Sequence, residues 1–187
     1  MGLASYYRKF IPGYSNIASP LHELTKGFPR KGKRITIQWS KLEDEAFNKL
    51  KDTLTEDVTL MYPDFNKPFR LTCDASDIAI GGCLSQLDSE GRDRPVSFFS
   101  KKLLPAETRY DAISREALAI IHGLRENRQY ILGREVSILS DNKPLVWLLQ
   151  AAVPAQCVAR WHILLSEYNI TNVKHIQGKS NMNGMIT

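Results

Sequence analysis

Two neighbouring segments in the middle of the chain constrain its fold more than any other feature. In FRLTCDAS (69–76), apolar and polar residues alternate with the two-residue period of a β-strand that has one buried face. The next segment, at about 79–87, contains Gly81 and Gly82, which let another backbone come close. The pattern predicts two adjacent strands, the first of which, at about 68–74, delivers Asp74 to the end of a partly buried sheet.

The chain beyond these two segments continues to alternate between strand and helix patterns. Further strands are expected at about 94–101, 135–140 and 170–177, and helices at about 111–127, 145–150 and 155–168. The order βββαβαα, followed by a last strand, predicts an α/β fold with a mixed sheet flanked by helices. In this sheet a three-strand meander is followed by crossover connections.

A smaller helical segment, residues 1–62, is expected ahead of the α/β domain at 63–187. Its predicted elements are short helices at 2–11 and 18–26 and a longer amphipathic helix that starts at the capping box Ser40-Lys-Leu-Glu43. The run Tyr62-Pro63-Asp64 interrupts the chain before the first strand, and we therefore place the domain boundary near residue 62.

Positive charge is concentrated near the N-terminus. The chain carries a net charge of +5, yet residues 1–40 contain seven Lys or Arg residues and a single acid, Glu23. A basic arm ahead of a nearly neutral domain favours a polyanionic partner such as nucleic acid. A solvated surface loop explains the same charges, and the sequence leaves both interpretations open.

The sequence also bears on the compartment. No apolar run approaches the ~20 residues that a membrane span needs, and the N-terminus lacks the long apolar region of a secretory signal. The three cysteines, Cys73, Cys83 and Cys157, lack metal-ligand spacing and suggest a reducing compartment. We expect an intracellular protein of the cytoplasm or nucleus with no membrane partner.

Three acids occupy informative positions, although each has an ordinary structural explanation. Asp74 ends a strand, where acids often start turns. Glu116 shares a helix face with Ile113 and Ile120, where a charge is costly unless its side chain reaches water at a rim. Asp141 follows the strand at 135–140, where it could also cap the next helix.

Taken together, the three acids indicate a metal site. Strand ends in α/β sheets gather ligand sites, and clustered carboxylates repel one another unless a cation neutralises them. Hard oxygen ligands suit Mg²⁺, and two such ions about 4 Å apart can activate water for phosphodiester cleavage. We therefore predict that Asp74, Glu116 and Asp141 bind metal and are catalytic.

The chain resembles the polymerase polyproteins of LTR retrotransposons of the Ty3/gypsy type. GLASYYRKFIPGYSNIASPLHELTKG resembles the thumb and connection region of their reverse transcriptases, and the passage from WSKLEDEAF to LTCDAS resembles the entry into their ribonuclease H domain. The motifs SREALAII, SDNKPL and HIQGKSN continue the match in order. The resemblance implies an RNase H-like fold and hydrolysis of the RNA strand of RNA–DNA hybrids with two Mg²⁺ or Mn²⁺ ions. It also implies that Asp74, Glu116 and Asp141 are the first three metal-binding carboxylates.

A second group of residues is expected to hold the nucleic acid. The thumb resemblance suggests that Tyr7, Arg8 and Lys9 contact it, because aromatic rings stack on bases and cations pair with phosphates. A helical core stripe explains the aromatic ring equally well. Backbone amides near Ser76 and Asn142 complete the predicted grip.

The sequence departs from the family at its end. The family's fourth carboxylate should fall at Met185, and a thioether is a poor ligand for Mg²⁺, so we expect the second ion to be held weakly. No polymerase aspartates are present, and we expect no DNA synthesis. The leading hypothesis is an RNase H-type endonuclease. The alternatives are a catalytically impaired nucleic-acid-binding module and a remnant of the retrotransposon protein that serves only in protein interaction or structure. The oligomeric state stays open.

Overall fold

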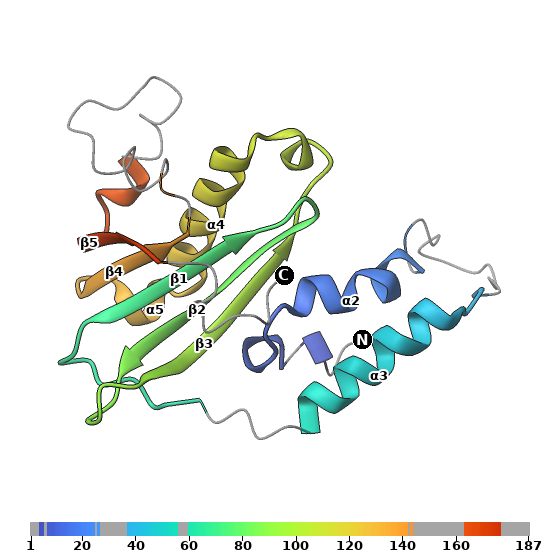
Figure 1. The fold of residues 1–187 in the computed structure, drawn as a ribbon, viewed down its shortest axis with the longest axis horizontal. Coiled ribbons are helices and arrows are strands. Elements are labelled where there is room, and N and C mark those ends of the chain that lie inside the picture. Colours follow the sequence, from blue (N-terminus) through green and yellow to red (C-terminus); the bar gives the residue numbers. More distant parts are fainter. Residues whose placement is uncertain are drawn as a thin grey trace.

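The computed structural model describes residues 4–5, 7–24, 26, 37–55, 60–141, 143 and 163–176. Its centre is a five-stranded sheet in the order β3-β2-β1-β4-β5 (Figure 1). The strands are β1 (Phe69–Ala75), β2 (Ala79–Leu87), β3 (Asp93–Lys102), β4 (Glu135–Ser140) and β5 (Asn169–His175). All five lie within two residues of the predicted bounds, because alternation is a local signal that the sequence carries in full.

The strand directions confirm the predicted mixed sheet. β1, β2 and β3 form an antiparallel meander, whereas β4 pairs in parallel with both β1 and β5. The parallel strand β4 is reached through α4 (Ala112–Glu126) and the short helix α5 (Arg128–Ile131). A short 3₁₀ turn, η2 (Glu107–Arg109), precedes α4. The predicted helix at 145–150 lies outside the described residues, as does most of the one at 155–168.

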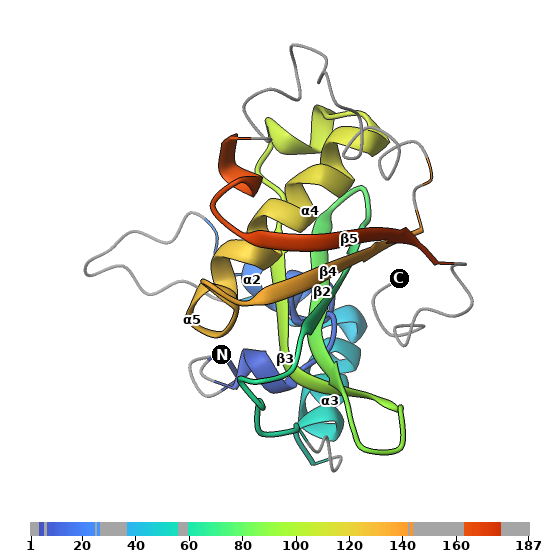
Figure 2. The same ribbon diagram turned by 90° about the vertical axis from the view of Figure 1, so that its left-hand side faces the viewer.

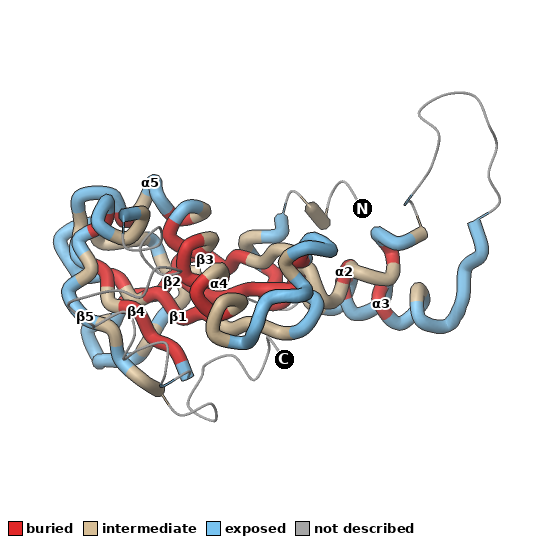
Figure 3. Tube along the Cα trace, turned by 90° about the horizontal axis from the view of Figure 1, so that it is seen from above, coloured by how far each residue is buried: buried red, intermediate tan, exposed pale blue. Residues whose placement is uncertain are grey.

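The main core lies between α4 and one face of the sheet. Phe69 and Leu71 of β1 face Ile120 and Leu124 of α4, and all four side chains are almost fully buried. Each such side chain contributes about 1.5–3 kcal/mol when it is removed from water. Figure 3 shows the burial concentrated in the sheet and in the inner side of α4.

The opposite face of the sheet is contacted by the first of the two N-terminal helices. α2 (Tyr14–Glu23) lies beside β3, and α3 (Lys41–Thr55) packs on α2 around a small separate cluster (Figures 1 and 2). Phe99 of β3 points toward α4, so Ser100 points to the other face, where its Oγ accepts a hydrogen bond from the Ser15 N–H at 3.0 Å. An ion pair between Lys102 and Glu23 adds a second link. The domain boundary near residue 62 stays a prediction.

The N-terminal helices differ from their predicted bounds. Of the described residues in 2–11, only 4–5 are α-helical, and Arg8–Phe10 form the 3₁₀ turn η1. Ile11 precedes Pro12 and is extended, because a residue before proline is disfavoured in the helical conformation. The next helix starts at Tyr14 rather than at 18, directly after Gly13 in the left-handed region at φ 60°.

The amphipathic helix α3 follows its capping box but buries less than the sequence suggests. The backbone N–H of Ser40 donates to the Glu43 carboxylate at 2.9 Å, as a capping box requires. Leu50 is buried against α2, whereas Leu42 and Phe47 remain 65% and 52% exposed. In the described part of the chain, no helix is long and apolar enough to cross a membrane.

Candidate carboxylate site and its family

Asp74 and Asp141 lie at the same edge of the sheet. Asp74 is the penultimate residue of β1, and Asp141 directly follows β4. These strands are parallel neighbours in which Thr72 pairs with Leu139, so the two acids lie at equivalent positions two residues further on. The predicted convergence of two strand-end carboxylates is therefore a consequence of the parallel β1–β4 register.

Glu116 approaches this edge from α4. Its side chain is only 7% exposed, and its Oε2 is buried without a hydrogen-bond partner among the described residues. Burial raises the pKa of Glu116 to about 8, with further contributions from the charges of Asp74 and Asp141; the Ala75 backbone amide acts in the opposite direction. The structure thus brings together the three acids that the sequence singled out.

Asp74 responds to the same surroundings. Its pKa is raised, first by burial and then by the charge of Asp141. A cation bound at this edge would relieve both the repulsion between the carboxylates and the lack of a partner for the Glu116 oxygen. The cluster is therefore electrostatically incomplete without positive charge.

The three carboxylates are chemically suited to Mg²⁺, but their side chains do not converge closely enough to bind it as they stand. Carboxylate oxygens are the ligands that this hard ion prefers. Among the described residues, however, no three His, Cys, Asp or Glu side chains converge closely enough to hold an ion. An ion bound here would have to draw the three carboxylates closer together. Met185, at the predicted fourth position, lies outside the described residues.

The sequence leaves His175, the first residue of HIQGKSN, open between a position near the site and an ordinary surface or core position. The Nε2 of His175, at the end of β5, lies 3.0 Å from the backbone carbonyl of Asp141. β5 pairs with β4 in parallel, and Ser140 pairs with His175. The pairing that places this histidine beside Asp141 joins residues 34 positions apart in sequence, so the local motif alone could not decide between these two positions.

Comparison with known proteins places the chain in a family. Residues 39–138 match the family described as the RNase H-like domain found in reverse transcriptase. The chain belongs to this family. The match covers β1 to β3, α4 and part of β4, and so includes Asp74 and Glu116.

Curated relatives of this RNase H-like domain are retrotransposon polyproteins, as the sequence resemblance implied. The chain is 43% identical over 182 residues to the retrovirus-related Pol polyprotein from transposon 297 of Drosophila melanogaster, covering 97% of this chain and 16% of the relative. It is 37% identical over 188 residues to the corresponding polyprotein from transposon gypsy of the same organism, covering 97% and 18%. The chain therefore spans less than a fifth of the length of these relatives.

Solved structures share the fold of this RNase H-like domain. A foamy viral protease-reverse transcriptase in complex with double-stranded DNA matches with a TM-score of 0.72 at 17% identity, covering 94% of this chain and 31% of that one. The foamy viral enzyme in complex with RNA/DNA hybrid matches with a TM-score of 0.69 at 18% identity, covering 92% and 24%. These similarities confirm the RNase H-like α/β fold.

The described residues predicted to hold nucleic acid lie in two places: Tyr7 and Arg8 in the N-terminal segment, and Ser76 two residues beyond Asp74. Tyr7 is 40% exposed and packs on Phe10, with 5.9 Å between ring centroids. Arg8 forms an ion pair with Glu126 at 3.4 Å, beside the C-terminal end of α4. The Ser76 N–H donates to the Ala79 carbonyl within the β1–β2 turn. Asn142 lies outside the described residues, and the binding role of all these residues stays a prediction.

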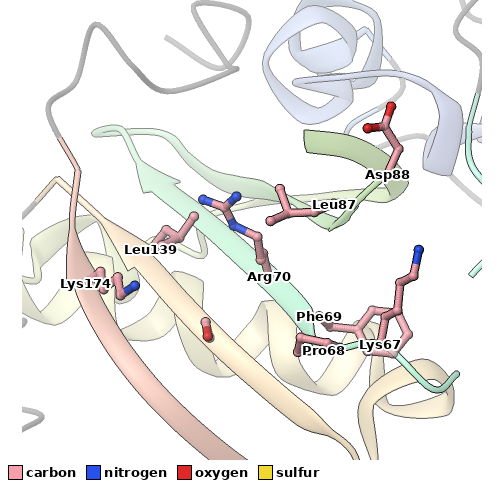
Figure 4. A pocket seen from close by; sticks show the side chains of 9 residues that line it. Lys67, Pro68, Phe69, Arg70, Leu87, Asp88, Leu139 and Lys174 are labelled. Carbon is pink, nitrogen blue, oxygen red and sulfur yellow. The ribbon is translucent and has the colours of Figure 1, made fainter. Parts of the chain in front are cut away.

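A groove of about 490 Å³ opens on the sheet face opposite α4 (Figure 4). Arg70 and Leu139 project into it from the neighbouring strands β1 and β4, and Lys174 from β5 adds a further cation. Much of its charge is already compensated, because Arg70 pairs with Asp93 at 3.3 Å and the carboxylate of Asp88 lines the same groove.

Proposed function

We propose that this RNase H-like domain hydrolyses the RNA strand of RNA–DNA hybrids in a reaction that depends on a divalent metal. The observation that carries the proposal is the gathering of Asp74, Glu116 and Asp141 at one sheet edge, in surroundings that raise the pKa of Asp74 and Glu116. Membership of the reverse transcriptase RNase H-like family supports it. A foamy viral relative of the same fold has been solved with RNA/DNA hybrid, which supports the substrate class.

Each carboxylate has a distinct part in this proposal. Asp74 and Asp141 offer oxygens from two adjacent strand ends, and Glu116 offers its unpartnered Oε2 from the helix. Bound Mg²⁺ or Mn²⁺ would supply water activation and stabilisation of the leaving oxygen. His175 would steady the end of β4 through the Asp141 carbonyl, and its role is positional. With Met185 at the fourth position, we expect a second ion to bind weakly.

Cleavage of a labelled RNA–DNA hybrid in Mg²⁺ and in Mn²⁺ tests the proposal. We expect cleavage by the parent chain and none by Asp74→Asn, which keeps the size of the side chain but loses its charge. Asp77→Asn is the matched control, because Asp77 lies three residues further on, is 88% exposed and pairs with Arg115. Loss of cleavage in both variants, or cleavage that survives in Asp74→Asn, would reject the assignment of the site.

A second candidate function is a nucleic-acid-binding module without catalysis. The observation that favours it is that no three of the described acidic, histidine or cysteine side chains converge enough to hold an ion. A folded chain that binds hybrid but leaves it intact in both metals would establish this alternative.

A further inference from the structure

A basic groove of about 560 Å³ lies between η1 and the corner where α4 passes into α5. Its charged lining side chains are Lys9, Arg125, Glu126, Arg128 and Arg134. Four cations therefore face a single carboxylate. They come from two parts of the chain more than a hundred residues apart in sequence.

The carboxylates around the groove already form ion pairs with arginine side chains. Glu126 pairs with Arg8 at 3.4 Å, and Arg128 pairs with Glu167 of the segment before β5. Within the described ranges, no carboxylate forms an ion pair with Lys9, Arg125 or Arg134. The groove thus keeps a surplus of positive charge, unlike the groove of about 490 Å³ on the sheet face opposite α4.

One of these cations is held in place. The guanidinium of Arg134 lies 4.4 Å from the centre of the Phe65 ring and donates to the backbone carbonyls of Tyr130 and Leu132. Cation–π contact and hydrogen bonds of this kind limit the freedom of a long side chain, so less entropy is lost when it binds an anion.

The dipole of α4 explains the position of only some of the four cations that line the groove. Cations in the last turn of a helix are favoured by its dipole, which accounts for Arg125 and, less directly, for Arg128 just beyond it. It does not account for Lys9 from the N-terminal turn or for Arg134 before β4, which line the same groove. The convergence of these separate segments indicates a binding surface for an anion.

We propose that this groove binds the phosphodiester backbone of nucleic acid at a position separate from the carboxylate edge. The identity of the ligand rests on the proposed function; the charge surplus and the shape of the groove are independent of it. Arg125 follows Glu116 by nine residues in α4, which corresponds to about 14 Å along the axis and half a turn around it. Nucleic acid would therefore be held at two places on different sides of the helix.

Salt-dependent binding tests this inference. We would measure the affinity of the full chain for a labelled RNA–DNA hybrid at several KCl concentrations, in the Asp74→Asn background so that the hybrid stays intact. The double variant Lys9→Ala/Arg125→Ala should bind about tenfold more weakly near 0.1 M salt, and its slope of log affinity against log salt should fall by about 2. Arg125→Glu should weaken binding on its own.

The matched control is Lys41→Ala/Arg92→Ala, which also removes two cations, from α3 and from the β2–β3 turn. It should leave affinity within about twofold and the slope nearly unchanged. A thermal unfolding curve for each variant checks that the fold is kept.

The outcomes separate this inference from the proposed function. Unchanged affinity and slope in the groove variants, with hybrid still bound by the parent, would overturn the groove while leaving the carboxylate site intact. If the parent does not cleave hybrid but the groove variants show a smaller slope of log affinity against log salt, the catalytic proposal is rejected and the groove inference stands. If polyglutamate bound in a groove-dependent way and hybrid did not, an acidic protein would be the partner and the inference would be wrong.

Discussion

The side-chain amide of Gln86 hydrogen-bonds both the N–H and the carbonyl of Asp64, at 2.9 and 2.8 Å. A third bond, at 3.0 Å, joins Gln86 to the carbonyl of Lys67. Gln86 is fully buried at the end of β2 and fastens the segment before β1 to the sheet. It thereby fastens the first residues of the predicted α/β domain, 63–187, to its sheet.

Replacing this side chain should be costly. Gln86→Leu takes the partner from the Asp64 N–H and the Lys67 carbonyl, and leaves the Asp64 carbonyl with only its bond from the Lys67 N–H. We expect the free energy of unfolding to fall by about 2–4 kcal/mol in a urea titration. Gln129→Leu is the control, because Gln129 is exposed and its loss should cost under about 0.5 kcal/mol. Equal costs for the two variants would show that the hydrogen bonds of Gln86 do not stabilise the fold.

The helix that carries Glu116 should depend on its N-cap. Asp111 accepts hydrogen bonds from the Ser114 N–H at 2.8 Å and from the Ser114 hydroxyl at 3.0 Å, which lower the pKa of Asp111. We expect Asp111→Ala to cost about 1 kcal/mol near neutral pH.

This cost should fade in acid. Because the folded pKa of Asp111 is depressed, its stabilisation is present above the unfolded value of 3.8 and is lost as the pH falls through the folded pKa. Asp111→Asn, which keeps an acceptor without a titrating charge, should remain close to the parent at neutral pH. Denaturation curves at pH 7 and pH 3 measure both effects, and a cost that persists unchanged at pH 3 would contradict them.

Glu116 should destabilise the metal-free fold at high pH. Its folded pKa of about 8 lies above the ordinary value of 4.5, so the advantage of the protonated form is complete below 4.5 and is lost as the pH rises through 8. Above pH 8 in EDTA, Glu116→Gln should therefore be more stable than the parent, by about 1–3 kcal/mol.

Divalent metal should reverse this order. If Mg²⁺ binds the three carboxylates, millimolar Mg²⁺ should raise the thermal midpoint of the parent more than that of Glu116→Gln. Glu135→Gln, an exposed change in β4, serves as the control for general ion effects. The same midpoint for the parent and Glu116→Gln in EDTA at pH 9 would contradict the raised pKa.

Two glycines make room for one aromatic ring. A Cβ on Gly82 would lie 2.1 Å from the Thr72 carbonyl oxygen and 2.5 Å from the Phe99 ring, and one on Gly123 would lie 2.5 Å from the same ring. Gly82→Ala should cost more than about 3 kcal/mol, because the backbone of β1 cannot give way. Gly123→Ala should cost about 1–3 kcal/mol, since the ring can shift.

Gly91→Ala provides the comparison for these variants. No atom lies within 4 Å of a Cβ there, but φ is +76°, so only backbone strain of about 1 kcal/mol is expected. Chemical denaturation ranks the three variants, and a Gly82 variant no worse than the Gly91 variant would contradict the close packing.

The sequence alone determined the strands, the main helix and the three acids. A strand of alternating polarity such as β1, and an acid within an apolar helix stripe such as Glu116, are local signals, because side-chain direction follows directly from backbone period. The helix expected at 2–11 was wrong because aromatic and basic residues at helical spacing did not outweigh the break at Pro12.

Only the tertiary structure decided which distant residues meet. The contact of His175 with Asp141, the bonds of Gln86 to Asp64 and the grouping of Lys9 with Arg125 and Arg134 all depend on strand pairing and helix docking. Such contacts join segments whose separation leaves no periodic trace along the chain. They form because the hydrophobic faces of the sheet, α4 and α2 must be buried together, and the polar residues carried on those elements are brought into proximity as a result.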